Sequence, residues 1–126
     1  MDVRFFEDIR QFDRLAAPLL LGREQQYTLL LEGLRRGRET GAEGYIMAAV
    51  RQEEEPRLIA LYRPPYNLLA AGADSRSVPE AAALMGTAFA GRTRDIPGVM
   101  GEAEISRSLA EGYAAALGKK PGWASA

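Results

Sequence analysis

Three short, mainly apolar segments in the middle of the chain constrain its fold more than any other feature. They are Tyr45–Val50, Leu58–Tyr62 and Asn67–Ala71, and they are separated by Glu53–Pro56 and by Pro64–Pro65. An unbroken apolar run is typical of a strand that is buried on both faces. The polar turn after the first run predicts that the first two strands form an antiparallel hairpin. The chain is therefore expected to build a sheet with helices packed on it.

Helical periodicity lies on both sides of this block. Apolar residues at spacings of three and four predict helices over Ile9–Leu20, from Tyr27 to Gly37, over Ala81–Phe89 and from Glu102 to Leu117. Pro18 lies inside the first pattern and predicts a kink or a restart there. Gly37 and Gly118 are predicted to end the second and the last helix. The inward positions of the last two helices are predicted to be Ala81, Leu84, Met85, Ala88, Phe89, Ile105, Leu109, Tyr113, Ala116 and Leu117.

Two shorter strands, Val3–Phe6 and Val99–Met100, complete the predicted order: strand, helix, helix, three strands, helix, strand, helix. This order predicts a domain that contains both helices and strands, of class α/β (α+β). Its sheet is expected to be mixed and mainly antiparallel. The strand–helix–strand unit from Asn67 to Met100 adds one parallel pair. Residues 1–118 are expected to form the domain, and residues 119–126 a linker-like or disordered tail.

The composition limits the chemistry that the chain can perform. With no Cys and no His, it has neither thiolate nor imidazole groups for disulfides, metal binding or general base catalysis, and we expect no metal site. The formal net charge is −1 and both signs are interspersed, so nucleic acid is not an expected partner. Charged residues interrupt the N-terminal segment and the apolar runs are short, so no signal peptide and no membrane span are expected. The predicted location is the cytoplasm.

Three motifs carry a resemblance to a known family: RPPYNLL at residues 63–69, IPGVMG at residues 96–101 and the leucine-rich YTLLLEGL at residues 27–34. Together with the order of elements, they resemble the N-terminal lobe of two-lobed bacterial proteins of the GNAT superfamily of N-acetyltransferases. The resemblance implies a GNAT-like fold for nearly the whole chain. It also implies a second, C-terminal catalytic lobe that holds acetyl-CoA, so that the intact protein transfers an acetyl group to an amine.

The chain departs from the superfamily at the cofactor loop. The superfamily pattern, Arg/Gln-x-x-Gly-x-Gly/Ala between a strand and a helix, directs backbone N–H groups at the pyrophosphate of acetyl-CoA. The equivalent segment here begins at Gly72 and has no glycine in its middle. Pro79 lacks an N–H donor, Asp74 would repel a phosphate, and Ser77 is expected to cap the following helix. We therefore expect no cofactor and no catalytic residue in this chain itself.

The expected function is that of a non-catalytic N-terminal lobe of an acetyltransferase, which packs against the catalytic lobe and helps to shape the acceptor cleft. The lobe is expected to be either separated from its partner or free-standing, and a separated lobe would expose a sheet edge and apolar surface that favour a homodimer. The alternative is a stand-alone module with a GNAT-like fold that binds a small ligand or dimerises. A minimal active enzyme with a degenerate cofactor loop is disfavoured by Asp74 and Pro79.

The candidate cleft-lining residues are Tyr62, Arg63, Tyr66 and Asn67, which lie at the end of a predicted strand. Their aromatic and amide groups suit an amine or amide acceptor. The competing interpretation is a double-proline corner with half-buried tyrosines and a solvated arginine. Tyr113 has the residue type of a general acid, but its spacing places it on the buried side of the last helix and favours core packing.

Overall fold

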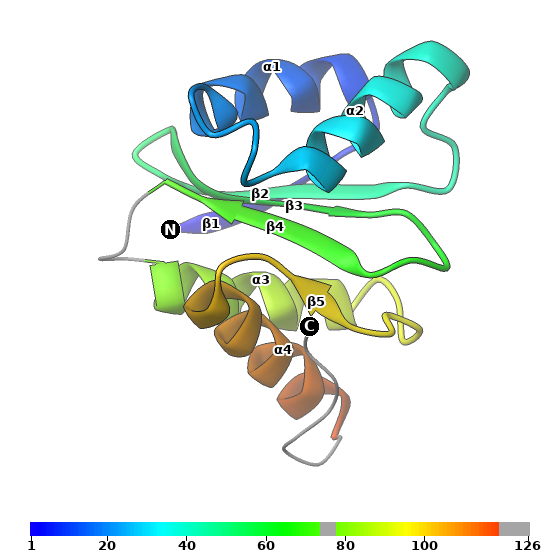
Figure 1. The fold of residues 1–126 in the computed structure, drawn as a ribbon. Helices are drawn as coiled ribbons and strands as arrows, with labels where there is room; N and C mark the ends of the chain where they lie inside the picture. Colours follow the sequence, from blue (N-terminus) through cyan, green and yellow to red (C-terminus); the bar gives the residue numbers. More distant parts are fainter. Residues whose placement is uncertain (74–77, 119–126) are drawn as a thin grey trace.

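The computed structural model of the 126-residue chain describes residues 1–73 and 78–118. Its elements are β1 (Asp2–Phe6), α1 (Ile9–Leu20), α2 (Thr28–Thr40), β2 (Ile46–Gln52), β3 (Glu55–Tyr62), β4 (Leu68–Gly72), α3 (Val78–Ala90), β5 (Val99–Met100) and α4 (Ala103–Leu117). The sheet lies between two helical layers, with α1 and α2 on one face and α3 and α4 on the other (Figure 1). The predicted α+β class and the predicted order of elements are confirmed.

The sheet has the strand order β1-β2-β3-β4-β5, and neighbouring strands are antiparallel except for the parallel pair β4–β5. The predicted hairpin and the predicted parallel pair are both confirmed. The parallel pair is short, because only Leu68 and Leu69 are matched, with Val99 and Met100 respectively. The backbone N–H of Leu68 donates to the carbonyl of Gly98 at 2.9 Å, which starts this pairing.

Alternation of side chains along the central strands divides the apolar residues into two cores. On β2, Met47 and Ala49 belong to the upper core, between the sheet and the helices α1 and α2. Ala48 and Val50 belong to the lower core, between the sheet and the helices α3 and α4. All four side chains are buried. This is why the strand reads as an unbroken apolar run in the sequence: both of its faces are covered.

The helices α3 and α4 approach each other backbone to backbone at two glycines. A Cβ atom on Gly86 would lie 2.2 Å from the carbonyl oxygen of Leu109, and one on Gly112 would lie 2.5 Å from that of Ala83. No side chain fits at either distance, so glycine is required for this contact. The pair forms a closely packed layer below the sheet.

The first helix has the predicted bounds, whereas the second ends later than predicted. α1 begins at the cap Asp8, whose Oδ1 accepts from the N–H of Arg10 at 2.9 Å, and it continues through Pro18 to Leu20. Pro18 is exposed while the next two leucines are buried, so packing holds the last turn helical and water can solvate the carbonyl that loses its partner. Of the kink or restart predicted at Pro18, the restart is wrong, because α1 continues through the proline.

Gly37 does not end α2, which runs to Thr40 and is capped by Gly41 at φ 96°. Gly37 instead permits a close approach: a Cβ there would lie 3.1 Å from a side-chain carbon of Ile9 and 3.2 Å from one of Tyr45. The predicted stop at Gly118 is confirmed, since this residue caps α4 with a left-handed φ of 75°.

The predicted inward faces of α3 and α4 are partly wrong. Leu84 and Ala116 are exposed and Ala88 is half-buried, whereas Ala82 and Ala114 are buried. The two helices pack on each other as well as on the sheet, so their buried sides are rotated from the positions that a single apolar stripe predicts.

Three predictions lie outside the described residues: the repulsion by Asp74, the helix cap at Ser77, and the tail of residues 119–126. Among the helices of residues 1–73 and 78–118, none is long and apolar enough to cross a membrane.

Candidate functional site

The predicted site residues lie at the connection between β3 and β4. The N–H of Tyr66 donates to the carbonyl of Arg63 at 2.9 Å and closes the turn. The guanidinium carbon of Arg63 lies 4.7 Å from the centroid of the Tyr66 ring. The tyrosine is 60% exposed, so the ring and the guanidinium form a stacked pair at the surface.

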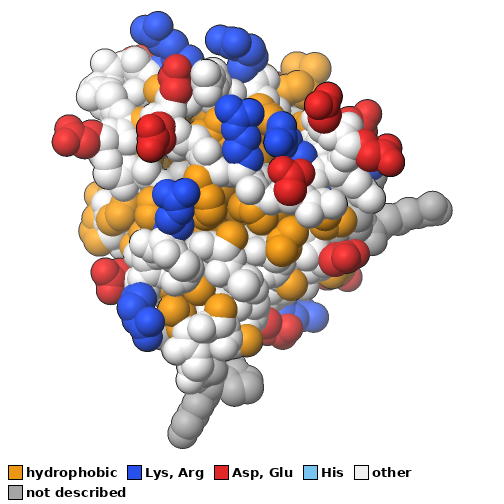
Figure 2. Space-filling model, turned by 180° about the vertical axis from the view of Figure 1, so that it is seen from behind, with side chains coloured by type: hydrophobic (Ala, Val, Ile, Leu, Met, Phe, Trp, Pro, Cys, Tyr) orange, Lys and Arg blue, Asp and Glu red, His pale blue; other side chains and the backbone are white. Residues whose placement is uncertain are grey.

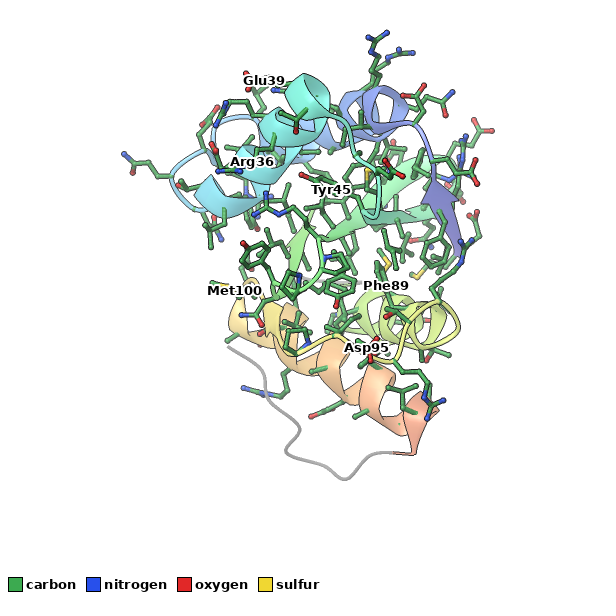
Figure 3. All side chains as sticks on the ribbon, turned by 90° about the vertical axis from the view of Figure 1, so that its right-hand side faces the viewer. Arg36, Glu39, Tyr45, Phe89, Asp95 and Met100 are labelled. Atoms are coloured by element: carbon green, nitrogen blue, oxygen red, sulfur yellow. The ribbon has the colours of Figure 1, made fainter. Side chains whose placement is uncertain are left out.

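This stacked pair borders a hollow of about 330 Å³ between α2 and the β4–β5 end of the sheet, which we call the α2 cleft. Its lining residues are Leu29, Glu32, Gly33, Leu61, Arg63, Tyr66, Asn67, Leu69 and Met100. Figure 3 shows Met100 below the helix that carries Arg36. Arg63, Tyr66 and Asn67 thus lie together around one hollow, with apolar side chains beside them.

Tyr62 does not line the α2 cleft. It is 1% exposed and belongs to the lower core, because neighbouring residues on a strand point to opposite faces and Leu61 takes the upper face. Its hydroxyl donates to the carbonyl of Asp95 at 3.2 Å. Burial, and then the negative charge of Asp95, raise the pKa of Tyr62 above its ordinary value. The alternation of side chains along the strand therefore excludes Tyr62 from the residues that line the cleft.

Tyr113 is a core residue, as its spacing predicts, with no exposed surface. Its hydroxyl donates to the carbonyl of Thr93 at 2.8 Å and accepts from the N–H of Ile96 at 3.3 Å. Burial raises the pKa of Tyr113 as well. The hydroxyls of Tyr62 and Tyr113 thus hold the segment between α3 and β5 in place. This segment leads to β5, whose residue Met100 lines the cleft.

A polar cluster that sequence reasoning missed lies beyond the cleft, at a neighbouring hollow. Glu102, the residue before α4, accepts three hydrogen bonds at Oε1: from Arg23 at 3.0 Å, Gln26 at 2.9 Å and Tyr27 at 3.0 Å. Arg23 also donates to the carbonyl of Gly72 at 2.8 Å. We call Arg23, Gln26, Tyr27 and Glu102 the polar junction. The only signal in the sequence is the carboxylate at a helix start, and its partners are 75 to 79 residues away.

The phenol of Tyr27 stays protonated in this cluster. Burial, followed by the hydrogen bond to Glu102, raises the pKa of Tyr27 to about 12. The polar junction borders a second hollow, of about 240 Å³, which shares Leu29, Leu69 and Met100 with the α2 cleft. The two hollows are therefore neighbours along one apolar floor.

The polar junction also closes the edge of β4 beyond its pairing with β5. After Met100 the chain turns away at Gly101, where a Cβ would lie only 2.8 Å from the carbonyl oxygen of Ala70. At Gly72, further along β4, the Arg23 guanidinium occupies the backbone acceptor. These contacts thus cover backbone groups of β4 that would otherwise form hydrogen bonds with a longer β5.

A different surface lies at the opposite edge of the sheet, which β1 forms. Seen from behind, hydrophobic side chains form a band across the middle of the molecule, with charged groups concentrated above it (Figure 2). Arg4 lies 4.6 Å from the centroid of the Phe6 ring and Arg92 lies 4.0 Å from that of Phe5. These cations lie over the rings of the buried Phe6 and the half-buried Phe5, and charged side chains along an edge strand oppose its pairing with another strand.

Few polar side chains line the α2 cleft. Its one acidic residue, Glu32, is ion-paired with Arg35 and with Arg36 on the same helix. Within residues 1–73 and 78–118 no group of three or more His, Cys, Asp or Glu side chains gathers where it could hold a metal ion. The lining therefore offers apolar contact, one cation, one ion-paired carboxylate, one amide and one phenol.

The fold is a mixed α+β domain with a hollow at the β4–β5 end of its sheet. Comparison with family models, with curated proteins and with solved structures gave no match to this chain.

Proposed function

We propose that this chain is a non-catalytic, GNAT-like lobe that helps to form the acceptor cleft of a two-lobed N-acetyltransferase. One observation carries the proposal. The three motifs of the resemblance, at residues 27–34, 63–69 and 96–101, are far apart in the sequence yet supply every lining residue of the α2 cleft except Leu61. If the motifs resembled the family only because of common packing preferences, they would not be expected to lie around a single hollow.

The absence of a catalytic role for this chain is supported by the charges around the cleft. The carboxylate of Glu32 is held by two arginines, and the phenol of Tyr27 has its pKa raised to about 12. Neither group is suited to accept a proton from an ammonium near neutral pH. The acetyl-transfer chemistry is assigned to a second lobe, which also binds acetyl-CoA.

The polar junction supports the same view of the cofactor. A ligand that paired with the backbone of β4 at Gly72 would have to displace the Arg23 guanidinium, which is also held by Glu102. Breaking a cluster of charge-assisted hydrogen bonds opposes such binding. This chain is therefore proposed to contribute shape and contacts rather than a cofactor site.

Titration of acetyl-CoA into the chain, followed by calorimetry, tests the proposal. We expect no heat and no change in melting temperature at millimolar ligand. Binding in the micromolar range would overturn the non-catalytic assignment. The coding sequence downstream of Ala126 gives a second test, because the proposal requires a strand–loop–helix segment with the glycine-rich cofactor pattern.

A stand-alone binding or dimerisation module is the second candidate. It is favoured by the exposure of two large side chains at the cleft, Leu29 at 55% and Tyr66 at 60%. A stop codon directly after Ala126 would favour this candidate over the lobe. Sedimentation equilibrium then separates its two forms, since a dimerisation module is a dimer at micromolar concentration and a ligand-binding module is a monomer.

A further inference from the structure

We propose that the α2 cleft binds a small molecule that has an apolar body and one carboxylate, with Arg63 receiving the carboxylate. The inference concerns the cleft of the proposed function and names the chemistry of its occupant. It does not depend on a second lobe, so the two proposals have separate tests.

The floor and rim of the cleft are built for an apolar body. Leu69 and Met100 are half-buried on the sheet, and the exposed side chains of Leu29 and Tyr66 stand at the rim. Large apolar side chains that remain in water around one hollow mark a surface whose covering is favourable. The cleft, at about 330 Å³, lies at the lower end of the volumes of small-molecule sites, which begin at about 300 Å³, and the neighbouring hollow adds about 240 Å³.

Arg63 supplies the charge for the head group. It is the one cationic side chain among the cleft's lining residues, and it forms no ion pair with a carboxylate of residues 1–73 and 78–118. The carbon of its planar guanidinium lies 4.7 Å from the centroid of the Tyr66 ring. The N–H groups at the edge of that plane stay available for the two oxygens of a carboxylate.

The neighbouring groups favour a carboxylate over a cation or a phosphate. Asn67 adds an amide donor beside Arg63. Glu32 would attract a cation, but Arg35 and Arg36 compensate its charge. A phosphate carries up to two charges, and a single guanidinium neutralises only one of them.

The experiment uses the full chain labelled with ¹³C at the methionine methyl groups and titrated with octanoate. Met100 lines the cleft, while Met47 and Met85 are buried elsewhere and serve as internal controls. We expect octanoate to shift the Met100 methyl signal in a saturable way and to leave the two buried signals in place. No saturable shift at Met100 would overturn the inference.

Two ligands of equal chain length separate the contributions of head and tail. We expect octanoate to bind more tightly than 1-octanol, and 1-octanol more tightly than octylammonium. Tightest binding of octylammonium would overturn the carboxylate assignment while leaving the acceptor-cleft proposal standing, which acetyl-CoA titration tests independently.

Variants then locate the two contacts. Arg63→Gln is expected to weaken octanoate binding about tenfold and 1-octanol binding hardly at all, as for the loss of one charge-assisted contact. Arg107→Gln, at an exposed arginine on α4, is the matched control and should bind like the wild type. Leu29→Ala should weaken both ligands by the same factor. Equal octanoate affinity of Arg63→Gln and Arg107→Gln would contradict the role of Arg63.

Discussion

The helix pairs on the two faces of the sheet are packed in different ways. Below the sheet, α3 and α4 touch backbone to backbone at Gly86 and Gly112. Above it, the glycines of α2 face side chains: a Cβ on Gly33 would meet Leu61 Cδ2 at 3.0 Å, and one on Gly37 would meet Ile9 and Tyr45. Side chains can rotate and a backbone cannot, so the lower layer is fixed and the upper layer can adjust.

The same difference distinguishes the lower layer, which supports the fold, from the upper layer, which carries the candidate site. The lower layer encloses Tyr62 and Tyr113, whose hydroxyls hold the segment leading to β5. The upper layer leaves the α2 cleft open and places Leu29 and Glu32 over it. A rigid layer that positions β5 beneath an adjustable helix is a suitable arrangement for a binding cleft.

The largest expected effect is that of Gly86→Ala in the lower layer. The added methyl group meets the Leu109 carbonyl at 2.2 Å, so the helices must separate, and we expect a loss of about 3 kcal/mol in the free energy of unfolding. Gly33→Ala is the matched change in the upper layer. Leu61 can move, and alanine gains up to about 1 kcal/mol of helix propensity, so the net change should stay within about 1 kcal/mol. Urea unfolding measures both, and equal losses would contradict the comparison.

A smaller loss is expected at the polar junction. Glu102→Ala removes the acceptor shared by Arg23, Gln26 and Tyr27, and we expect it to reduce the free energy of unfolding by about 1 kcal/mol, since the side chain is partly exposed. Glu111→Ala, at an exposed position on α4, is the control and should be neutral. Equal stability of the two variants would show that the junction does not stabilise the fold.

The raised pKa of Tyr27 gives a pH dependence with a definite sign. The phenol loses its proton near pH 10 when unfolded and near pH 12 when folded, so the stabilisation is complete below pH 10 and is lost as pH rises towards 12. Tyr62 and Tyr113 have raised pKa values too and act in the same direction. The urea midpoint should therefore fall between pH 10 and 12. The fall should be shallower in Tyr27→Phe, and parallel curves for the two proteins would exclude the assignment.

The smallest effect is expected for the stacked pair at the cleft. Arg63→Gln and Tyr66→Ala should each change the free energy of unfolding by no more than about 0.5 kcal/mol, because Tyr66 is 60% exposed, Arg63 is only half-buried, and a cation–π contact at the surface contributes little. Thermal unfolding followed by circular dichroism measures this. A loss of 2 kcal/mol in either variant would mean that the pair is part of the framework rather than of the site.

The sequence predicts the sheet well because its signals are local. Unbroken runs such as Tyr45–Val50 mark strands with two covered faces, and the strand–helix–strand unit ending at Met100 allows one parallel pair. Helix ends are predicted less well. Gly37 has the residue type of a stop, but its role depends on Ile9 and Tyr45, which only the folded chain brings near it.

The candidate site is predicted in part for the same reason. Arg63, Tyr66 and Asn67 lie on one turn, so their proximity follows from the sequence. The contribution of Leu29 and the closure by Arg23 and Glu102 depend on how α2 and α4 meet the sheet. No periodicity in the chain records a contact between residues that are 79 positions apart.

Hydrogen exchange of the backbone amides, with and without octanoate, tests most directly the claim that a fixed lower layer supports an adjustable, ligand-binding upper layer. We predict that the amides of α3 and α4 exchange only through global unfolding, and that those of α2 exchange through smaller openings and are slowed by octanoate. Equal protection of α2 and α4 in the free chain, or protection by octanoate that falls on α4 instead of α2, would contradict the account.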